Sequence, residues 1–232
     1  MRITSIYRFL ASVIPFVIFF NVNGQPEASP QAVFNPSNVV FREAMSGLVQ
    51  PILNLAAGES TRVSYPGVNN GPVRIESNQA IVAAQRVIYT VKGVQTSFSE
   101  MMALPDSQVD TTYWLPWYNH VGLDSQLRLA NVSGSPATVR VYIGGVEMPG
   151  SPFQLPTGGI TRKVYAGVNH GPVQIVSDQN IIAAQRVIYR VNALPTSFSE
   201  LMGLPAPQLD TLHWLPWYNN VGLESGLRFA AP

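Results

Sequence analysis

The segment IVAAQRVIYTV at residues 81–91 returns as IIAAQRVIYRV at residues 181–191, and it gives the clearest indication of how this chain folds. Both copies are long runs of apolar and β-branched side chains, which is typical of a central strand in a sheet. Outward from these runs, residues 65–130 match residues 165–230 without a gap, always at an offset of 100. A match of this length at one fixed offset indicates an internal duplication.

The segments around these runs also carry strand patterns. Residues 73–76 (VRIE) and 139–143 (VRVYI) alternate apolar and polar side chains, as on half-buried strands, and the pair Gly144-Gly145 supplies a hairpin turn. One helical turn is expected at residues 99–103 and again at 199–203, but no long helix, since no segment sustains helical spacing. About seven short strands in each repeat predict an all-β fold of two tandem immunoglobulin-like β-sandwich domains, with a small barrel as the alternative.

The duplication sets the expected domain boundaries. Residues 34–133 are expected to form the first β-sandwich repeat and residues 134–232 the second, with a leader at 25–33 before them. The match weakens toward the start of each repeat but persists there. The aligned residues are Val39, Leu55, Thr61 and Arg62 with Val139, Leu155, Thr161 and Arg162, so each repeat is about a hundred residues long.

The first residues have the pattern of a secretory signal peptide, expected to span residues 1–24. Arg2 and Arg8 precede an apolar run at residues 9–20. That run is shorter than the roughly 20 residues that a membrane-spanning helix needs, so cleavage is expected and no membrane span should remain in the mature chain. The protein is therefore expected to be secreted, extracellular or on the cell surface.

Composition excludes several classes of function. Lys and Arg total 14 and Asp and Glu total 13, so there is no basic excess to hold a polyanion, and nucleic acid is not expected as a partner. The chain has no cysteine, which removes thiolate nucleophiles, thiolate zinc sites and iron–sulfur clusters. Its 18 Gly and 19 Pro, with only 12% charged residues, favour turns and short strands over solvated helices.

The most unusual motif is WLPWYN, at residues 114–119 and again at 214–219. Exposed rings of this kind stack on sugar faces, whereas buried rings fill the core or seal the edge of a small domain. Pro116 cannot donate to a strand ladder, which predicts an edge strand or a bulge. Because Tyr113 becomes His213, that ring is expected on the surface. The candidate ligand-binding residues are Trp114, Trp117, Tyr118, Asn119, Trp214, Trp217, Tyr218 and Asn219.

Each repeat also carries two opposite charges within apolar or small-residue stretches. They are Arg86 and Glu100 in the first repeat and Arg186 and Glu200 in the second. A buried charge normally needs a partner, so we expect a structural ion pair in each repeat that ties the long strand to the loop after it. Recognition of a ligand hydroxyl by the carboxylate is the alternative.

The sequence offers no catalytic or metal-binding constellation. His120, His170 and His213 fit no metal-ligand spacing, and the acidic residues lack the spacing of a calcium loop. No serine lies in a nucleophile-elbow pattern, and no Gly-rich stretch has the lysine of a phosphate-binding loop. The chain is therefore expected not to be an enzyme and to need no cofactor.

Four motifs together resemble repeat modules of bacterial exported and cell-surface proteins. They are Gly-Pro-Val-(Arg/Gln)-Ile, Gln-Arg-Val-Ile-Tyr, Ser-Phe-Ser-Glu and Trp-Leu-Pro-Trp-Tyr-Asn. The resemblance covers almost all of the chain after the apolar run. It implies an extracellular β-sandwich repeat with a structural or adhesive role, and it transfers no catalytic residues.

These observations favour a secreted binding or adhesion protein whose two similar faces gain avidity on a repetitive target. Surface polysaccharide, a cell-surface protein or a neighbouring subunit would suit, so self-association is also expected. The alternative is a purely structural spacer or fibre subunit, which predicts that Trp114, Trp117 and Tyr118 are buried. An extracellular hydrolase ranks last, because no set of acid, base and nucleophile can be named.

Overall fold

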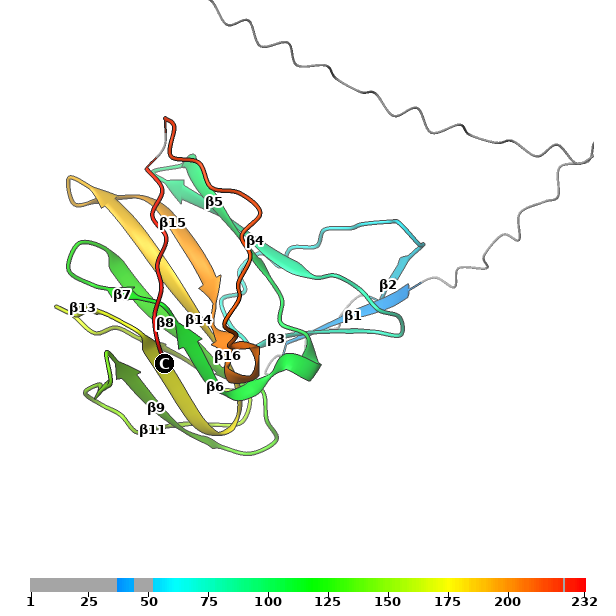
Figure 1. Cartoon of the computed structure of the whole chain (residues 1–232). Coiled ribbons are helices and arrows are strands. Elements are labelled where there is room, and N and C mark those ends of the chain that lie inside the picture. Colours follow the sequence, from blue (N-terminus) through cyan, green and yellow to red (C-terminus); the bar gives the residue numbers. More distant parts are fainter. Residues whose placement is uncertain (1–36, 44–51, 223) are drawn as a thin grey trace, which may run out of the picture. The chain divides into compact units, whose positions relative to one another are not determined.

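Strands supply almost all the regular structure of the computed structural model, which describes residues 37–43, 52–222 and 224–232 (Figure 1). The fold is therefore all-β, as the sequence predicts. The helical elements among these residues are two single turns of 3-10 helix. No helix in this part of the chain has the length and apolar character needed to cross a membrane.

The first repeat begins with five strands in two small antiparallel sheets. In one sheet, β1 (Ser37–Glu43) lies between β2 (Ile52–Leu55) and β3 (Val73–Ser77). The other sheet is a hairpin of β4 (Ala84–Val91) and β5 (Val94–Met102). The alternating VRIE segment lies in β3, and the repeated apolar run lies mostly in β4.

The second repeat has the same order of strands as the first, together with additional short strands. Its strands are β9 (Ala137–Ile143), β10 (Val146–Glu147), β11 (Phe153–Leu155), β12 (Ile160–Lys163), β13 (Asn169–His170), β14 (Val173–Val191), β15 (Leu194–Met202) and β16 (Leu204–Pro205). Gly144 and Gly145 both have positive φ and form the β9–β10 turn, as their sequence predicts. The long β14 corresponds to β3 and β4 joined into one continuous strand.

The strands at the end of the first repeat pair with strands of the second repeat. It contains η1 (Asp106–Gln108), β6 (Asp110–Leu115), β7 (Tyr118–Asn119) and β8 (Asp124–Asn131). Both β6 and β8 pair with β14, β8 also pairs with β12, and β7 pairs with β13. The result is a nine-stranded sheet made of β6, β8 to β12 and β14 to β16 (Figure 1).

The hydrophobic core belongs to this sheet and crosses the repeat boundary predicted at 133/134. The first repeat supplies Tyr113, Leu115, Tyr118, Leu127 and Leu129. The second supplies side chains that include Val139, Val141, Val173, Ile175 and Ile181. The end of the first repeat and the second repeat thus share one core. Division into two immunoglobulin-like domains at 34–133 and 134–232 stays a prediction from the sequence.

The helical turns expected at 99–103 and 199–203 are wrong. All but the last residue of each segment lie in β5 and β15, where they pair with the preceding strand. The 3-10 turns come later, at η1 and at η2 (Ala206–Gln208), directly after Pro105 and Pro205. Pro105 and Pro205 are the extended cap residues before the turns, where the missing N–H removes no hydrogen bond of the turn.

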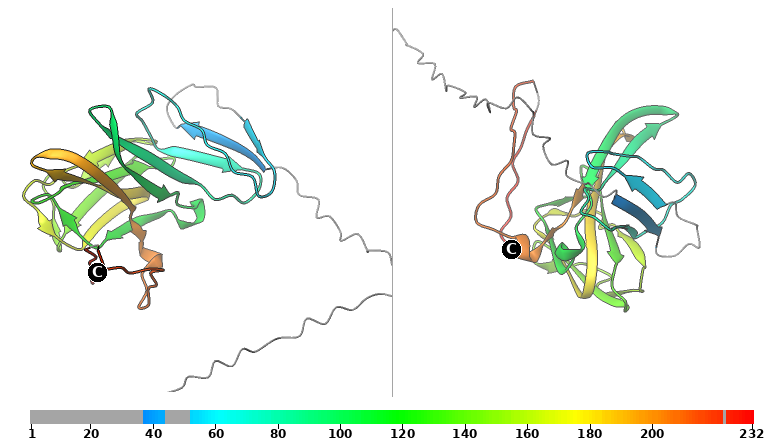
Figure 2. Two further views of the ribbon diagram at one scale, coloured as in Figure 1. Left: turned by 90° about the horizontal axis from the view of Figure 1, so that it is seen from above. Right: turned by 90° about the vertical axis from the view of Figure 1, so that its right-hand side faces the viewer.

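The two hairpins of the repeats lie next to each other. Ser99 Oγ on β5 accepts a hydrogen bond from the Glu200 backbone N–H on β15 (2.9 Å). Figure 2 shows the β4–β5 hairpin beside the β14–β15 hairpin, and shows the chain after η2 continuing without a strand. The stretch after η2 is the counterpart of β6, β7 and β8.

Candidate interaction site

The aromatic motif of the first repeat is part of the core. Leu115 and Tyr118 are 1% and 0% exposed. The Tyr118 hydroxyl donates to the Ser125 carbonyl (2.8 Å) and accepts a hydrogen bond from the Tyr165 backbone N–H (2.8 Å). Burial raises the pKa of Tyr118, and it raises the pKa of Tyr165 to about 12. This part of the motif therefore joins the two repeats.

Tyr113, directly before the motif, is also buried, so its expected surface position is wrong. Its hydroxyl donates to the Ile181 carbonyl (2.9 Å) and accepts from the Asp110 N–H (3.1 Å). The strand that carries it, β6, lies between β14 and β16, so it is paired on both sides and is not an edge. The change to His213 did not indicate exposure, because the two copies of this position have different surroundings.

Trp114 and Trp117 are partly exposed. Trp117 Nε1 donates to Asn169 Oδ1 (2.8 Å), and the ring stacks on His170 with centroids 6.2 Å apart and planes 4° apart. The Arg228 guanidinium lies 5.2 Å from the centre of the Trp117 ring. The two tryptophans therefore line the border of the core and contact solvent with part of each ring.

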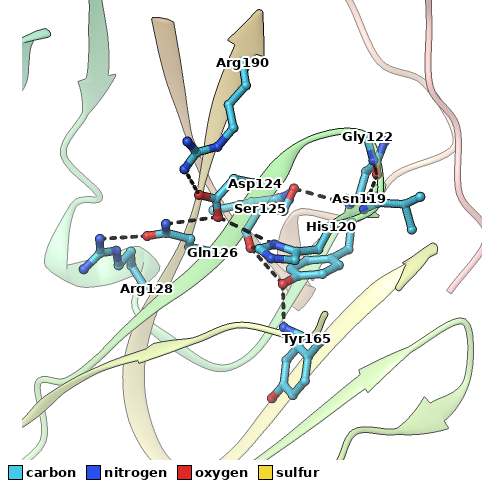
Figure 3. Close-up of polar contacts among 12 residues, drawn as sticks. Asn119, His120, Gly122, Asp124, Ser125, Gln126, Arg128, Tyr165 and Arg190 are labelled. Carbon is cyan, nitrogen blue, oxygen red and sulfur yellow. Dashed lines mark hydrogen bonds and ion pairs between the residues drawn. The ribbon is translucent and has the colours of Figure 1, made fainter. Parts of the chain in front are cut away.

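Polar contacts hold the loop that follows the motif (Figure 3). Asn119 Oδ1 accepts hydrogen bonds from the N–H groups of Val121 and Gly122, both at 3.0 Å. The Asp124 carboxylate pairs with Arg190 at 3.0 Å. Burial raises the pKa of Asp124, but hydrogen bonds, led by the one from Arg190, outweigh that effect and hold the pKa below its ordinary value. The polar groups of this loop are thus used in structural contacts.

The aromatic motif of the second repeat is exposed. Trp214 and Trp217 are 84% and 80% exposed, and Tyr218 is 55% exposed. The local turn is nevertheless that of the first repeat: the Tyr218 hydroxyl donates to the Ser225 carbonyl (2.9 Å), and Asn219 Oδ1 accepts a backbone N–H (2.8 Å). The motif keeps the local conformation of its counterpart without the core that covers it.

This exposure extends along residues 209–222 and 224–232, which we call the C-terminal half-unit. Several of its apolar side chains occupy repeat positions that are buried in the first copy. The exposed residues Leu215, Leu227 and Phe229 correspond to the core residues Leu115, Leu127 and Leu129. The described part of the half-unit forms no strand, because a strand needs a partner edge to satisfy its backbone.

The start of the first repeat shows the complementary exposure. We call residues 37–43 and 52–103 the N-terminal half-unit. Val73, Ile75 and Ile81 are exposed there, whereas Val173, Ile175 and Ile181 are completely buried. Among the described residues, β3 and β4 have no neighbour equivalent to β6 or β8. Each half-unit therefore exposes an apolar face, whereas the equivalent face of the other repeat is covered within the chain.

The expected ion pairs form across strands. Arg86 on β4 and Glu100 on β5 face each other with 3.1 Å between guanidinium and carboxylate. Arg186 donates from Nε (2.9 Å) and Nη2 (2.7 Å) to one oxygen of Glu200, across β14 and β15. Both partners of each pair lie on strands, so the pair links two strands and not a strand to a loop.

The two ion pairs should differ in their effect on stability. The Glu200 side chain is only 8% exposed, so Glu200→Gln is expected to lower the free energy of unfolding by about 1–3 kcal/mol, because Arg186 loses its charged partner. The Arg86–Glu100 pair is roughly half exposed, and Glu100→Gln should change the free energy by about 0–1 kcal/mol. Urea unfolding of both variants measures this, and equal losses would contradict the assignment.

Two further contacts between the repeats were missed by sequence reasoning. Ser99 binds the Glu200 N–H, as described above, and Gln208 Nε2 donates to Gln108 Oε1 (2.8 Å). These residues have no unusual pattern around them. The repeat offset is the one signal that could have paired them, since each contact joins nearly equivalent positions of the two copies.

Comparison of the chain with protein families, with curated proteins and with solved structures finds no match. The resemblance to bacterial exported repeat modules thus stays a prediction from the motifs. Among the described residues, His, Asp and Glu side chains do not gather in threes as a metal site would require. The feature that distinguishes the site is the exposed apolar surface of the two half-units.

Proposed function

We propose that this chain is an exported structural protein of the cell surface or extracellular medium, and that its function is self-assembly. In this proposal each repeat becomes a complete immunoglobulin-like β-sandwich once its two halves have partners. One observation carries the proposal: the C-terminal half-unit exposes the side chains that form the core in the first copy. Large contiguous apolar patches are rare on soluble monomers and mark interaction surfaces.

The polar groups around the buried motif support a structural role. Asp124 is paired with Arg190, and the Tyr118 hydroxyl has both a donor and an acceptor partner. Such groups stabilise a turn and a core, whereas a catalytic group needs access to a substrate. The proposed protein therefore acts through its surfaces and needs no cofactor.

A second candidate function is the binding of surface polysaccharide or of a cell-surface protein. The exposure of Trp214 and Trp217 favours it, because flat rings in contact with water can stack on sugar faces. The two proposals differ in what covers these rings. Self-assembly buries them against protein, whereas polysaccharide binding requires them to stay open until the glycan arrives.

Sedimentation velocity across a wide range of protein concentration tests the proposal. We expect species larger than the monomer to increase with concentration. Tryptophan emission should shift to the blue in the same range, because Trp214 and Trp217 become partly buried, as Trp114 and Trp117 are. A chain that stays monomeric, and whose emission changes only when polysaccharide is added, would contradict self-assembly and support the second candidate.

A further inference from the structure

We infer that the C-terminal half-unit of one copy of this chain pairs with the N-terminal half-unit of a second copy, in the register that β6 and β8 hold against β12 and β14. The inference rests on the proposed function, and it names the partner and the register of the contact. A second copy is the partner because one chain carries both complementary faces.

The observed sheet predicts the contact residue by residue. In the observed sheet, the opposed pairs are Ala130 with Ile160, Leu129 with Ala183 and Leu115 with Val173. The equivalent pairs between copies are Ala230 with Ser60, Phe229 with Ala83 and Leu215 with Val73. Every apolar member of these pairs that is exposed in the chain corresponds to a buried side chain in the core. The contact therefore repeats an interface that the chain already forms with itself.

The N-terminal half-unit is already arranged as a receptor. The register of β1 with β2 and β3 equals that of β9 with β11 and β14, shifted by 100 residues. The register of β4 with β5 equals that of β14 with β15. Within the described residues, this half-unit lacks the two strands that β6 and β8 supply, and residues 60–63 and 69–70, the counterparts of β12 and β13, form no strand. Association then adds strands to the existing edges of β3 and β4, and residues 60–63 become a strand opposite the added segment, as β12 is opposite β8.

A pair of sequence differences agrees with this register. At Gly203, a Cβ atom would lie 3.2 Å from the Tyr113 ring and 3.0 Å from the Ala183 carbonyl oxygen, so the glycine makes room for tyrosine. In the equivalent contact between copies, Ala103 replaces the glycine and His213 replaces the tyrosine. The larger residue at 103 thus faces the smaller ring at 213.

The hairpins supply an independent set of complementary residues. Tyr89 contacts Phe198 edge to face, with centroids 5.1 Å apart, and Phe198 is 6% exposed. The other two rings of the same positions, Tyr189 and Phe98, are 52% and 64% exposed. In the proposed assembly Tyr189 of one copy covers Phe98 of the next. Each interface would then contain the same ring contact that joins the repeats within the chain.

The same hairpins show that the contact is head to tail. If the two repeats were related by a two-fold axis, the contact of Tyr89 with Phe198 would be matched by a contact of Tyr189 with Phe98. Both of these last rings are instead exposed. The contact between the repeats is therefore heterologous: it joins two different surfaces. Repeating the same contact adds a further copy of the chain. It does not return the C-terminal half-unit to the N-terminal half-unit of its own chain.

Disulfide formation tests the register, and the chain suits this test because it has no cysteine of its own. We propose the double variant Ser60→Cys with Ala230→Cys, since both residues are small and exposed in the single chain. In the inferred contact they lie directly opposite each other, within the separation of about 4.4–6.8 Å between Cα atoms that a disulfide requires. Under oxidising conditions, a non-reducing gel should show a ladder of dimers, trimers and larger species.

Two controls accompany this variant. Ser60→Cys with Ser225→Cys places the second thiol five residues away along the same segment, roughly 17 Å in a strand, and should give no ladder. The two single-cysteine variants mixed together should give dimers linked between positions 60 and 230, which mass spectrometry of the peptides identifies.

The outcomes separate the register from the proposed function. A disulfide within one chain overturns the inference, because the half-units then close on themselves. Assembly in sedimentation without the 60–230 disulfide overturns the register and leaves self-assembly standing. Loss of both signals overturns the inference together with the proposed function.

Discussion

Leu127→Ala is expected to lower the free energy of unfolding by about 2–5 kcal/mol, whereas Leu227→Ala should change it by less than about 0.5 kcal/mol. The two residues occupy the same position of the repeat, but Leu127 is completely buried and Leu227 is 51% exposed. Truncation of a buried leucine removes its transfer free energy and leaves a cavity. Urea unfolding at low protein concentration measures both changes on single chains.

The same pair of variants should behave in the opposite way in association. Leu227→Ala removes apolar surface from the C-terminal half-unit, so it should weaken self-assembly while the fold of the single chain is kept. Leu127 is not available at the surface, and its truncation should weaken assembly only as far as it unfolds the chain. Equal losses of stability in the two variants would show that both copies of this position are packed alike, contrary to the structure.

Gly171→Ala is expected to be among the most destabilising single substitutions in this chain. A Cβ atom at Gly171 would overlap the Pro116 carbonyl oxygen and lie 3.1 Å from Trp117 Cα, and backbone atoms cannot move aside cheaply. Overpacking of this kind costs about 1–3 kcal/mol, and more where the obstacle is backbone. Thermal unfolding of Gly171→Ala measures the loss.

Gly71→Ala is the matched variant in the first repeat. Its Cβ atom would meet the Ile160 side chain at 3.4 Å, an ordinary contact, so the single chain should keep its melting temperature. In the inferred assembly, Pro216 of the neighbouring copy occupies the place of Pro116, and the added Cβ should block association. A Gly71→Ala chain that assembles as well as the unchanged chain would contradict the register.

Much of the local structure followed from the sequence. Alternation in the VRIE segment predicted β3, and the glycine pair at 144 and 145 predicted the turn between β9 and β10. These features depend on residues close in sequence, whose pattern of side chains and backbone freedom is visible without the fold. The helical turn at 99–103 was misplaced because a short apolar segment fits one turn of helix as well as a strand.

The candidate site could be located from the sequence but not described. The WLPWYN motif was found as a repeated aromatic cluster, and the Arg–Glu pairs were matched from their charges alone. The sequence treats the two copies of each feature alike, because burial depends on what lies opposite in space. Leu115 and Leu215 stand in nearly identical segments, yet one is in the core and the other is exposed.

The duplication, the all-β fold and the alternation that gives each strand an apolar face could all be predicted from the order of the residues. Which of these faces meet depends on how distant strands pair in space. The strands that end the first repeat pair with β12 and β14 of the second, so the core forms across the repeat boundary and leaves a half-unit open at each end of the described chain. Strand pairing forms backbone hydrogen bonds between segments that are distant in sequence. Because the two repeats have nearly the same sequence, the pattern of side chains does not indicate whether a strand pairs within its own repeat or with the other one.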